Sequence, residues 1–375
     1  MRLTPRRLNR ATLSRQLLLG REPLGAVEAM QRIVAVQAQE PASPYIALWN
    51  RLHGFDPNDL DRAFAAHAVV KATLIRITLH AVAAADYAPF HEAMQPSLRG
   101  SRLTDTRFTV AGLSTGDALA LVPEVLAFAS EPRTNGDIEA WLDERLGASS
   151  GRAAWWALRT FGPFVHVPTG GPWSFGPRPV YIAAPDQRRA SDPEAALPHL
   201  VRRYLQGFGP ASVQDVARFA FVQVSRVRAA VKVLGDALVR IEGPGGSELL
   251  DVPDGSIPPE DSPAPPHLMA MWDNTLLAYV DRTRIIPTEY RKLVIRNNGD
   301  VLPTLLVDGY VAGVWRPLDG RIEASAFRRL PRDAWIALEA EASALRAFLA
   351  DRDPTPYRRY GRWWQAMPVE EVRLL

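Results

Sequence analysis

The sequence predicts an α+β fold with three similar segments in a row and a β-rich C-terminal region. In each segment, apolar residues first recur at helical spacing and then alternate as in strands, so two or three helices precede a hairpin. This order is the winged helix-turn-helix pattern, a unit of nucleic-acid recognition. After the proline-rich residues 253–266, short apolar runs with glycine turns indicate a small β-barrel or sheet. We expect three winged helices, at residues 1–112, 113–190 and 191–256, and a C-terminal β-barrel with a terminal helix and tail at 257–375.

The first segment opens with an amphipathic helix that ends near Val36, because Pro41 keeps the residue before it out of the α region. A helix over residues 44–52 follows. Asp56 can cap the next helix, whose first residue is Pro57. Strands are expected at residues 69–73 and 76–80, with a short closing helix at 84–94.

In the second and third segments, capping residues mark where helices begin. Thr115 is expected to cap a helix that reaches residue 130, and another helix starts at residue 134 or 135. Ser212 and Asp215 have the spacing of a capping box, and Ser225 is expected to cap a helix over residues 226–234. A further helix is expected at residues 152–160, and strands at 164–167, 180–182, 237–241 and 248–252.

The C-terminal region has a different pattern. Strands are expected at residues 276–280, 293–296, 301–307 and 311–315, with turns at 297–300 and 308–309. A helix over residues 332–350 follows, and then an arginine and aromatic tail at residues 357–364.

Composition excludes several classes of protein. The 375 residues include no cysteine, so disulfides, thiolate chemistry and cysteine zinc sites are excluded. The basic N-terminus lacks the apolar core of a signal peptide, and no apolar run is long enough for a membrane span. The histidines lack metal-ligand spacing, and no nucleotide-binding motif is present. We expect a cytoplasmic, nucleoid-associated protein without metal or cofactor.

The net charge of +3 is low for a nucleic-acid-binding protein. Nearly all the cations are arginine, and the only lysines are Lys71, Lys232 and Lys292. Arginine suits phosphate and base contacts, but the codon bias of a GC-rich genome explains most of this excess.

Gln37 and Gln39 follow the first amphipathic helix. On a helix, residues two apart point in different directions, whereas in an extended segment they face the same way. If both glutamines serve one site, the helix must end before them and the run must be extended or looped. Two neutral amides can hold a water, a sugar edge or a base, but they are not strong acids or bases. Alternatively, they only satisfy carbonyls at the helix end.

This Gln-aliphatic-Gln run, followed by proline and an aromatic-rich helix, resembles the AlkZ and YcaQ-like bacterial DNA glycosylases, which are winged-helix proteins that remove alkylated purines. The resemblance implies that Gln37 and Gln39 are catalytic. Some relatives have aspartate at the second position, so Gln39 places the chain closer to the AlkZ branch. The resemblance spans nearly the whole chain and includes three further runs, which are Arg76-x-Thr78-Leu79-His80, Gly209-Pro-Ala-Ser-x-x-Asp215 and Trp272 to Arg284.

The implied function is hydrolysis of the N-glycosidic bond of bulky N7-alkylated purines, including interstrand crosslinks. Alkylation at N7 makes the base cationic and a good leaving group, so positioned water and electrostatic help are sufficient. The resemblance also implies a concave DNA-binding channel formed by the three winged helices. The partner is then double-stranded DNA with alkylated or crosslinked purines, and the enzyme a monomer that acts in DNA repair or in self-resistance to an alkylating toxin.

Other residues are candidates for DNA contact, and each has a structural alternative. His53 and His80 could contact phosphate or the catalytic water, or could merely end a helix and a strand. Arg282 or Arg284 could reach DNA phosphate. Alternatively, Arg282 could form a structural ion pair with Asp281. We expect Asp273 and Asp281 to be structural, and the asparagines to probe a groove or to cap a solvated hairpin. The candidates are His53, Arg76, Thr78, His80, Arg282, Arg284, Asn297 and Asn298.

We expect a monofunctional glycosylase, because a lyase needs an amine for a Schiff base and the nearest lysine in sequence is Lys71. A Lys71 that folded into the channel would weaken this argument. Two alternatives remain, namely a non-catalytic winged-helix transcription regulator and a protein that sequesters lesions without cutting. A regulator should bind one sequence tightly, often as a symmetric dimer, whereas a glycosylase should bind many sequences.

Overall fold

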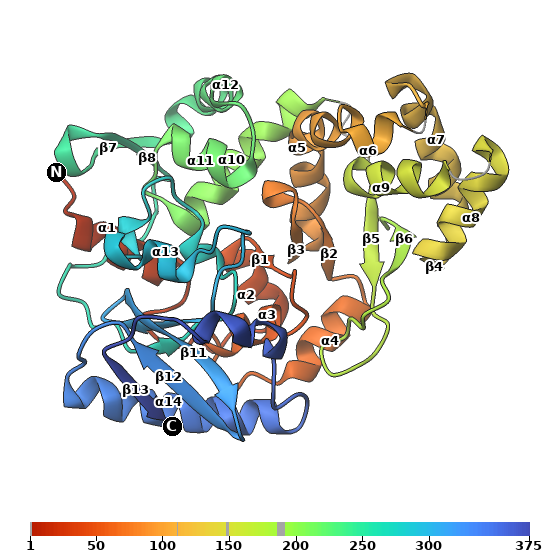
Figure 1. Cartoon of the computed structure of the whole chain (residues 1–375). Helices are drawn as coiled ribbons and strands as arrows, with labels where there is room; N and C mark the ends of the chain where they lie inside the picture. The colour runs from red at the N-terminus through yellow and green to blue at the C-terminus, as the bar shows by residue number, and fades with distance from the viewer. Residues whose placement is uncertain (1, 111, 148–149, 186–191) are drawn as a thin grey trace.

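Figure 1 shows the computed structural model, which describes residues 2–110, 112–147, 150–185 and 192–375. Residues 2–103 form five α-helices with three short strands between them. They are α1 (Pro5–Arg15), α2 (Ala26–Ile33), β1 (Val36–Gln37), α3 (Ser43–Trp49), α4 (Pro57–Ala65), β2 (Val69–Thr73), β3 (Leu79–Ala83) and α5 (Ala84–Leu103).

Helices followed by a hairpin occur twice more. The second group is α6 (Thr106–Thr109), α7 (Thr115–Phe128), β4 (Arg133–Thr134), α8 (Asn135–Leu146), α9 (Gly151–Phe161), β5 (Phe164–Val167) and β6 (Val180–Ala183). The third is α10 (Pro193–Phe208), α11 (Val213–Ala220), α12 (Val224–Leu234), β7 (Val239–Glu242) and β8 (Glu248–Asp251). The C-terminal part is β9 (His267–Leu268), α13 (Arg291–Val294), β10 (Thr304–Val307), β11 (Tyr310–Leu318), β12 (Arg321–Ala326), α14 (Arg332–Ala350) and β13 (Glu371–Leu374).

The first two hairpins join into one sheet with the strand order β1-β3-β2-β5-β6-β4. Its two halves meet where Lys71 of β2 pairs with His166 of β5. The third hairpin, β7-β8, forms a separate two-stranded sheet. The C-terminal sheet has the order β13-β12-β11-β10-β9 and is open, since its edge strands do not pair with each other in the described chain. The expected closed barrel is therefore not confirmed.

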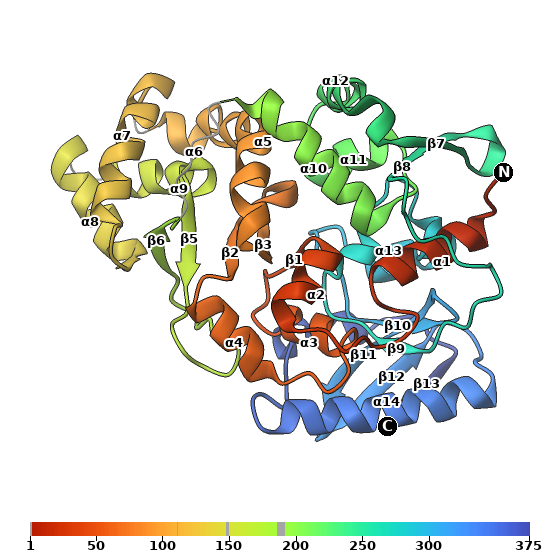
Figure 2. The same cartoon turned by 180° about the vertical axis from the view of Figure 1, so that it is seen from behind.

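Two large cores hold the chain together. One contains side chains of α2, α3 and α4 together with the C-terminal sheet and α14. The other joins α5 to the second and third helical groups. Figures 1 and 2 show this division, with α14 along one end of the molecule and α5 to α12 at the other. β1 to β3 lie between the two cores. Among the described residues, no helix is long and apolar enough to cross a membrane.

Several predicted helix starts are confirmed. Asp56 caps α4 with Pro57 at its first position, Thr134 caps α8, and Ser212 and Asp215 form a capping box on α11. The helix at residues 332–350 and the strands at 69–73 and 164–167 are also confirmed.

Other predictions were wrong. The cap of α7 is Ser114 and not Thr115, and α12 starts at Val224, before Ser225. The strand expected at 76–80 is a 3-10 turn followed by β3, which begins at Leu79. No strand forms at 276–280 or 293–296, where the chain has a 3-10 turn (Asn274–Leu276) and α13. Helix α1 and strands β12 and β13 were not foreseen.

Candidate active site at the Gln-Ala-Gln run

The Gln-Ala-Gln run is not helical: it leaves strand β1 after Gln37 and bends at Gln39, within the extended or looped geometry that the site hypothesis required. Helix α2 ends at Ile33, and Val34 reverses the chain with a φ of 75°. Gln37 then lies in β1 opposite His80 of β3, and the Ala38 N–H donates to the Leu79 carbonyl at 2.8 Å. Gln37 is 4% exposed, whereas Gln39 is exposed. The backbone pairing therefore fixes the first glutamine and leaves the second at the surface of a cavity.

Arg76 and Asn274 determine how the Gln37 amide is oriented. Arg76 Nη2 donates to Gln37 Oε1 at 3.0 Å and to Asn274 Oδ1 at 2.8 Å. Asn274 in turn donates to the Ala35 carbonyl at 2.8 Å, just before β1. A guanidinium has donors only, so the amide oxygen must face it. The Gln37 Nε2 group has no hydrogen bond to any described residue and remains available to donate to a water or substrate atom.

The surroundings of Gln37 are electropositive. Burial and the charges of Arg282 and Arg218 lower the pKa of Arg76 to about 9, so Arg76 is still a cation at neutral pH. Burial, Arg291 and Arg218 likewise lower the pKa of Arg282 to about 10. The neighbouring cations that lower the pKa values of Arg76 and Arg282 also produce a positive potential, which attracts phosphate. In addition, Arg76 Nη1 is buried without a hydrogen-bond partner.

His80 is completely buried beside this arginine. Burial, and then the charge of Arg76, lower the pKa of His80 to about 3. Its Nδ1 lies 3.1 Å from the Thr78 carbonyl, and its Nε2 faces Arg76. At physiological pH it is therefore neutral, and it supplies no charge to a phosphate.

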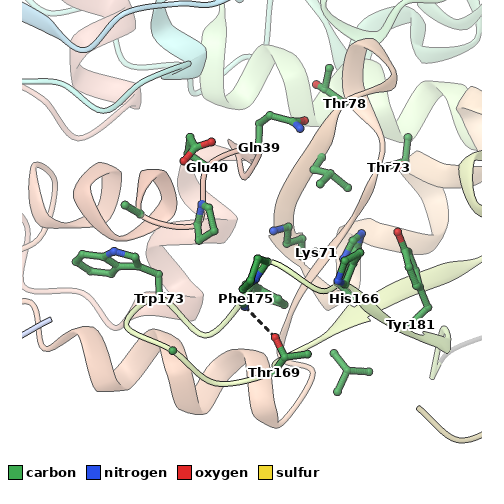
Figure 3. Close-up of a pocket in the computed structure, with 18 of the residues that line it drawn as sticks. Gln39, Glu40, Lys71, Thr73, Thr78, His166, Thr169, Trp173, Phe175 and Tyr181 are labelled. Carbon is green, nitrogen blue, oxygen red and sulfur yellow. Dashed lines mark hydrogen bonds between the residues drawn. The ribbon is translucent and has the colours of Figure 1, made fainter. Parts of the chain in front are cut away.

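Gln39 lines a cavity of about 760 Å³ between the first and second helical groups and the C-terminal tail. Figure 3 shows Gln39, Glu40 and Lys71 on its wall, together with aromatic side chains of the second group. Lys71 Nζ lies 4.4 Å from the centre of the Phe175 ring. Burial, opposed by the Glu40 carboxylate, lowers the pKa of Lys71 to about 8. The cavity thus combines the neutral amide of Gln39, a carboxylate and an amine.

Comparison with known proteins identifies the family. A model of the family described as DNA glycosylase AlkZ-like matches residues 30–348. The chain belongs to this family. The interstrand DNA cross-link repair glycosylase of Streptomyces sahachiroi is 24% identical over 353 residues, which is 88% of this chain and 92% of that protein. The solved structure of Streptomyces sahachiroi DNA glycosylase AlkZ matches with a TM-score of 0.79 and 22% identity, over 95% of this chain and 99% of that one.

The chain is thus an AlkZ-like DNA glycosylase, a hydrolase of DNA repair, and the resemblance found in the sequence is confirmed. The family assignment favours the glycosylase over the transcription regulator. Its mixed α and β fold, which positions the Gln-Ala-Gln run, is the fold of the AlkZ structure.

The structure brings only some of the sequence candidates to the site of this AlkZ-like enzyme. Arg76 and His80 adjoin Gln37, and Thr78 lines the cavity with Gln39. His53 is exposed beyond α3, where its backbone N–H donates to the Glu22 carbonyl. It does not line that cavity.

The C-terminal candidates have structural contacts of their own. Arg282 donates to the Leu276 carbonyl, and Arg284 donates to the Pro210 carbonyl while it stacks on a tyrosine ring. Asn297 and Asn298 are exposed at a turn closed by one bridge, Ile295 to Val301, so the turn does not join two regular strands.

The suggested Asp281–Arg282 ion pair does not form. Asp281 is exposed and caps the backbone of Thr283 instead. The buried pair at this place joins Asp273 to Arg51, with side chains 2% and 1% exposed. Asp273 is therefore structural, as expected, but through a partner just after α3 that the sequence did not indicate.

Asn274 was missed from the sequence, and Lys71 was named there only as a condition, since its presence in the channel would weaken the argument for a monofunctional enzyme. Asn274 lies in the Trp272 motif, and only its contacts with Arg76 and Ala35 reveal its place. Lys71 lies far from Gln39 in sequence but lines the same cavity. Its signal was present, because Lys71 shares a strand face with the buried Val69.

Proposed function

We propose that this DNA glycosylase hydrolyses the N-glycosidic bond of bulky N7-alkylated purines, including those in interstrand crosslinks, with Gln37 and Gln39 as catalytic residues. The observation that carries the proposal is the pairing of a fixed amide with an open one. Gln37 is held by Arg76, and two residues later Gln39 opens onto the cavity. Such a pair can hold one water and one face of the sugar.

The chemistry needs no strong acid. N7 alkylation gives the purine a positive charge, so the C1′–N9 bond breaks to release a neutral base. Water then forms the new bond at C1′ and loses a proton to solvent. The amides position that water and the electron-poor sugar by hydrogen bonds. His80 is unsuited as an acid, since its pKa of about 3 keeps it neutral. Base release by water needs no amine nucleophile, so Lys71 has no part in this step.

The size of the cavity supports a bulky substrate. About 760 Å³ is in the range of pockets that bind drug-sized molecules, and the cavity opens to solvent. Trp156, Tyr181 and Trp173 contribute aromatic surface to its wall. An aromatic adduct carried by a purine could stack there while the sugar remains at the glutamines.

We propose further that the three helical groups are winged helices, at residues 1–112, 113–190 and 191–256, which surround duplex DNA as a monomeric channel. The succession of helices and hairpin in each group supports this. Phosphate would be attracted by the cluster of Arg76, Arg218 and Arg282. Contacts of His53, Thr78, Arg284, Asn297 and Asn298 with DNA stay predictions, which alanine variants and DNA affinity can measure.

The test is release of N7-methylguanine from methylated duplex DNA, measured for the wild type and for Gln37→Ala. We expect release by the wild type and loss of most release in the variant, with an unchanged circular-dichroism melt. A crosslinked duplex tests the bulky substrate in parallel. Equal release by both proteins would refute the assignment of Gln37, and no release from either duplex would refute the proposed substrate class.

A further inference from the structure

Lys71 has an unusual position for a lysine. It lies in β2 at the centre of the six-stranded sheet, paired with Ala81 on one side and His166 on the other. Its residue surface is only 5% exposed, yet its side chain lines the cavity that Gln39 lines. Its ammonium group lies against the Phe175 ring, and no described residue gives it a hydrogen bond or an ion pair within 4 Å.

The choice of lysine is informative in this chain. Of 44 basic residues only three are lysine, and the other two, Lys232 and Lys292, are exposed. A cation needed only for phosphate or for stacking on a ring is served equally well by arginine. What lysine adds is a nucleophilic amine, which the permanently charged guanidinium lacks.

The surroundings make that amine available. With a pKa of about 8, roughly one Lys71 side chain in ten is a free amine at pH 7. Glu40 lines the same cavity, where it accepts from the Tyr360 hydroxyl at 2.9 Å and pairs with Arg359. A nucleophile and a carboxylate base thus face one space beside Gln39, where base release would leave an abasic sugar.

We propose that Lys71 attacks the abasic aldehyde left by base release, so that the enzyme has a second, strand-cleaving activity. The proposal rests on the glycosylase function of the family and does not depend on the identity of the alkylated base. It concerns the product of hydrolysis, so it adds a step after release by water and leaves that step unchanged.

The reaction balances as follows. The Lys71 amine adds to C1′ of the ring-opened sugar, and water leaves to give an imine. Loss of the C2′ proton, which Glu40 can accept, breaks the C3′–O bond by β-elimination. The downstream strand departs with a 5′-phosphate. Hydrolysis of the imine then restores Lys71 and leaves an unsaturated aldehyde on the upstream strand.

The experiment uses a duplex with a preformed abasic site, made by removing a single uracil, so that no base release by this enzyme is needed. Sodium borohydride reduces the imine to a stable amine, and a covalent protein–DNA adduct then appears on a denaturing gel. We expect adduct and strand cleavage with the wild type. Lys71→Gln and Lys71→Arg should lose both at least tenfold, and Lys232→Gln should match the wild type.

Peptide mapping of the adduct identifies the amine that reacts, and thermal melts show whether the Lys71 variants fold. If Lys71→Gln fails to fold, Lys71→Arg provides the comparison, because it keeps the charge and removes the nucleophile. No wild-type adduct, or an adduct mapped to another amine, overturns the proposal. Base release from the methylated duplex and from the crosslinked duplex is measured beside it. Trapping without release contradicts the proposed substrate alone, and release without trapping contradicts Lys71 alone.

Discussion

Replacing Arg76 by methionine tests whether this guanidinium acts through the Gln37 amide or directly on DNA. The first role predicts a lower rate constant of base release, and the second predicts a lower affinity for DNA. In the structure, Arg76 Nη2 donates to Gln37 Oε1 at 3.0 Å, and the same nitrogen holds Asn274. Without it, the Gln37 side chain is free to turn its oxygen toward the substrate, and the amide that should donate is misplaced.

The size of the effect follows from one charge-assisted hydrogen bond. Such a bond contributes about 1.5–3 kcal/mol. Suppose that this whole free energy serves to orient Gln37 in the transition state. Its loss in Arg76→Met then lowers the rate constant of base release about 10- to 160-fold, because each 1.36 kcal/mol is a factor of ten. A direct phosphate contact would instead weaken DNA binding and leave the rate constant at saturation unchanged.

The assay is single-turnover release of N7-methylguanine at saturating enzyme, with DNA affinity measured separately. Arg218→Met is the matched control, because Arg218 is an exposed cation in the same cluster that does not touch Gln37. Arg218→Met should lower the affinity for DNA and leave the rate constant of base release unchanged. The decisive variant combines Arg76→Met with Gln37→Ala. If Arg76 acts through Gln37, the double variant is no slower than Gln37→Ala. Independent, multiplying losses would refute the reasoning.

Gln39, two buried histidines and the Arg51–Asp273 ion pair each give a further prediction. Gln39→Asp should keep base release with a changed lesion preference; complete loss would show that a neutral amide is required there. Burial lowers the pKa of His80 to about 3 and of His91 to about 4. The unfolded chain therefore binds more protons below pH 6.5, and the free energy of unfolding should fall as pH falls from 6.5 toward these values. A denaturant midpoint that stays constant from pH 7.5 to 5 would contradict this. Arg51→Met should cost about 3–5 kcal/mol in urea unfolding, because it leaves the Asp273 carboxylate buried without its partner, and a loss below about 1 kcal/mol would count against that pair.

Features that depend on neighbours in the chain were predictable. The capping box of Ser212 and Asp215 is a local arrangement, and it is present as expected. The start of α7 was missed by one residue, although the same rule would have found it, since Asp117 is three residues after Ser114. The end of helix α2 before the glutamines was also predictable, because Gln37 and Gln39 can face one site only where the run is not helical.

The C-terminal region was harder to predict because burial there is not periodic. Residues 276–279 are all buried, and the run appears as a strand. A short apolar run cannot by itself distinguish a strand from an irregular buried segment. Here the run is wedged between the first and third helical groups, where the Tyr279 hydroxyl bonds Thr12 and the Phe208 carbonyl. Side-chain contacts thus replace the backbone pairing that a strand would have.

The site itself depends on contacts that no local pattern contains. Asn274 binds the Ala35 carbonyl across 239 positions of sequence and Arg76 across 198. Strand register places Lys71 between the first and second helical groups, and so on the cavity wall. The glutamines alone supply neutral hydrogen bonds. The residues around them orient the Gln37 amide, set the charge near the DNA and place the Lys71 amine on the cavity wall. A variant of Asn274 should therefore disturb Gln37 as strongly as a change at Arg76, although Asn274 has no hydrogen bond of its own to the Gln37 side chain.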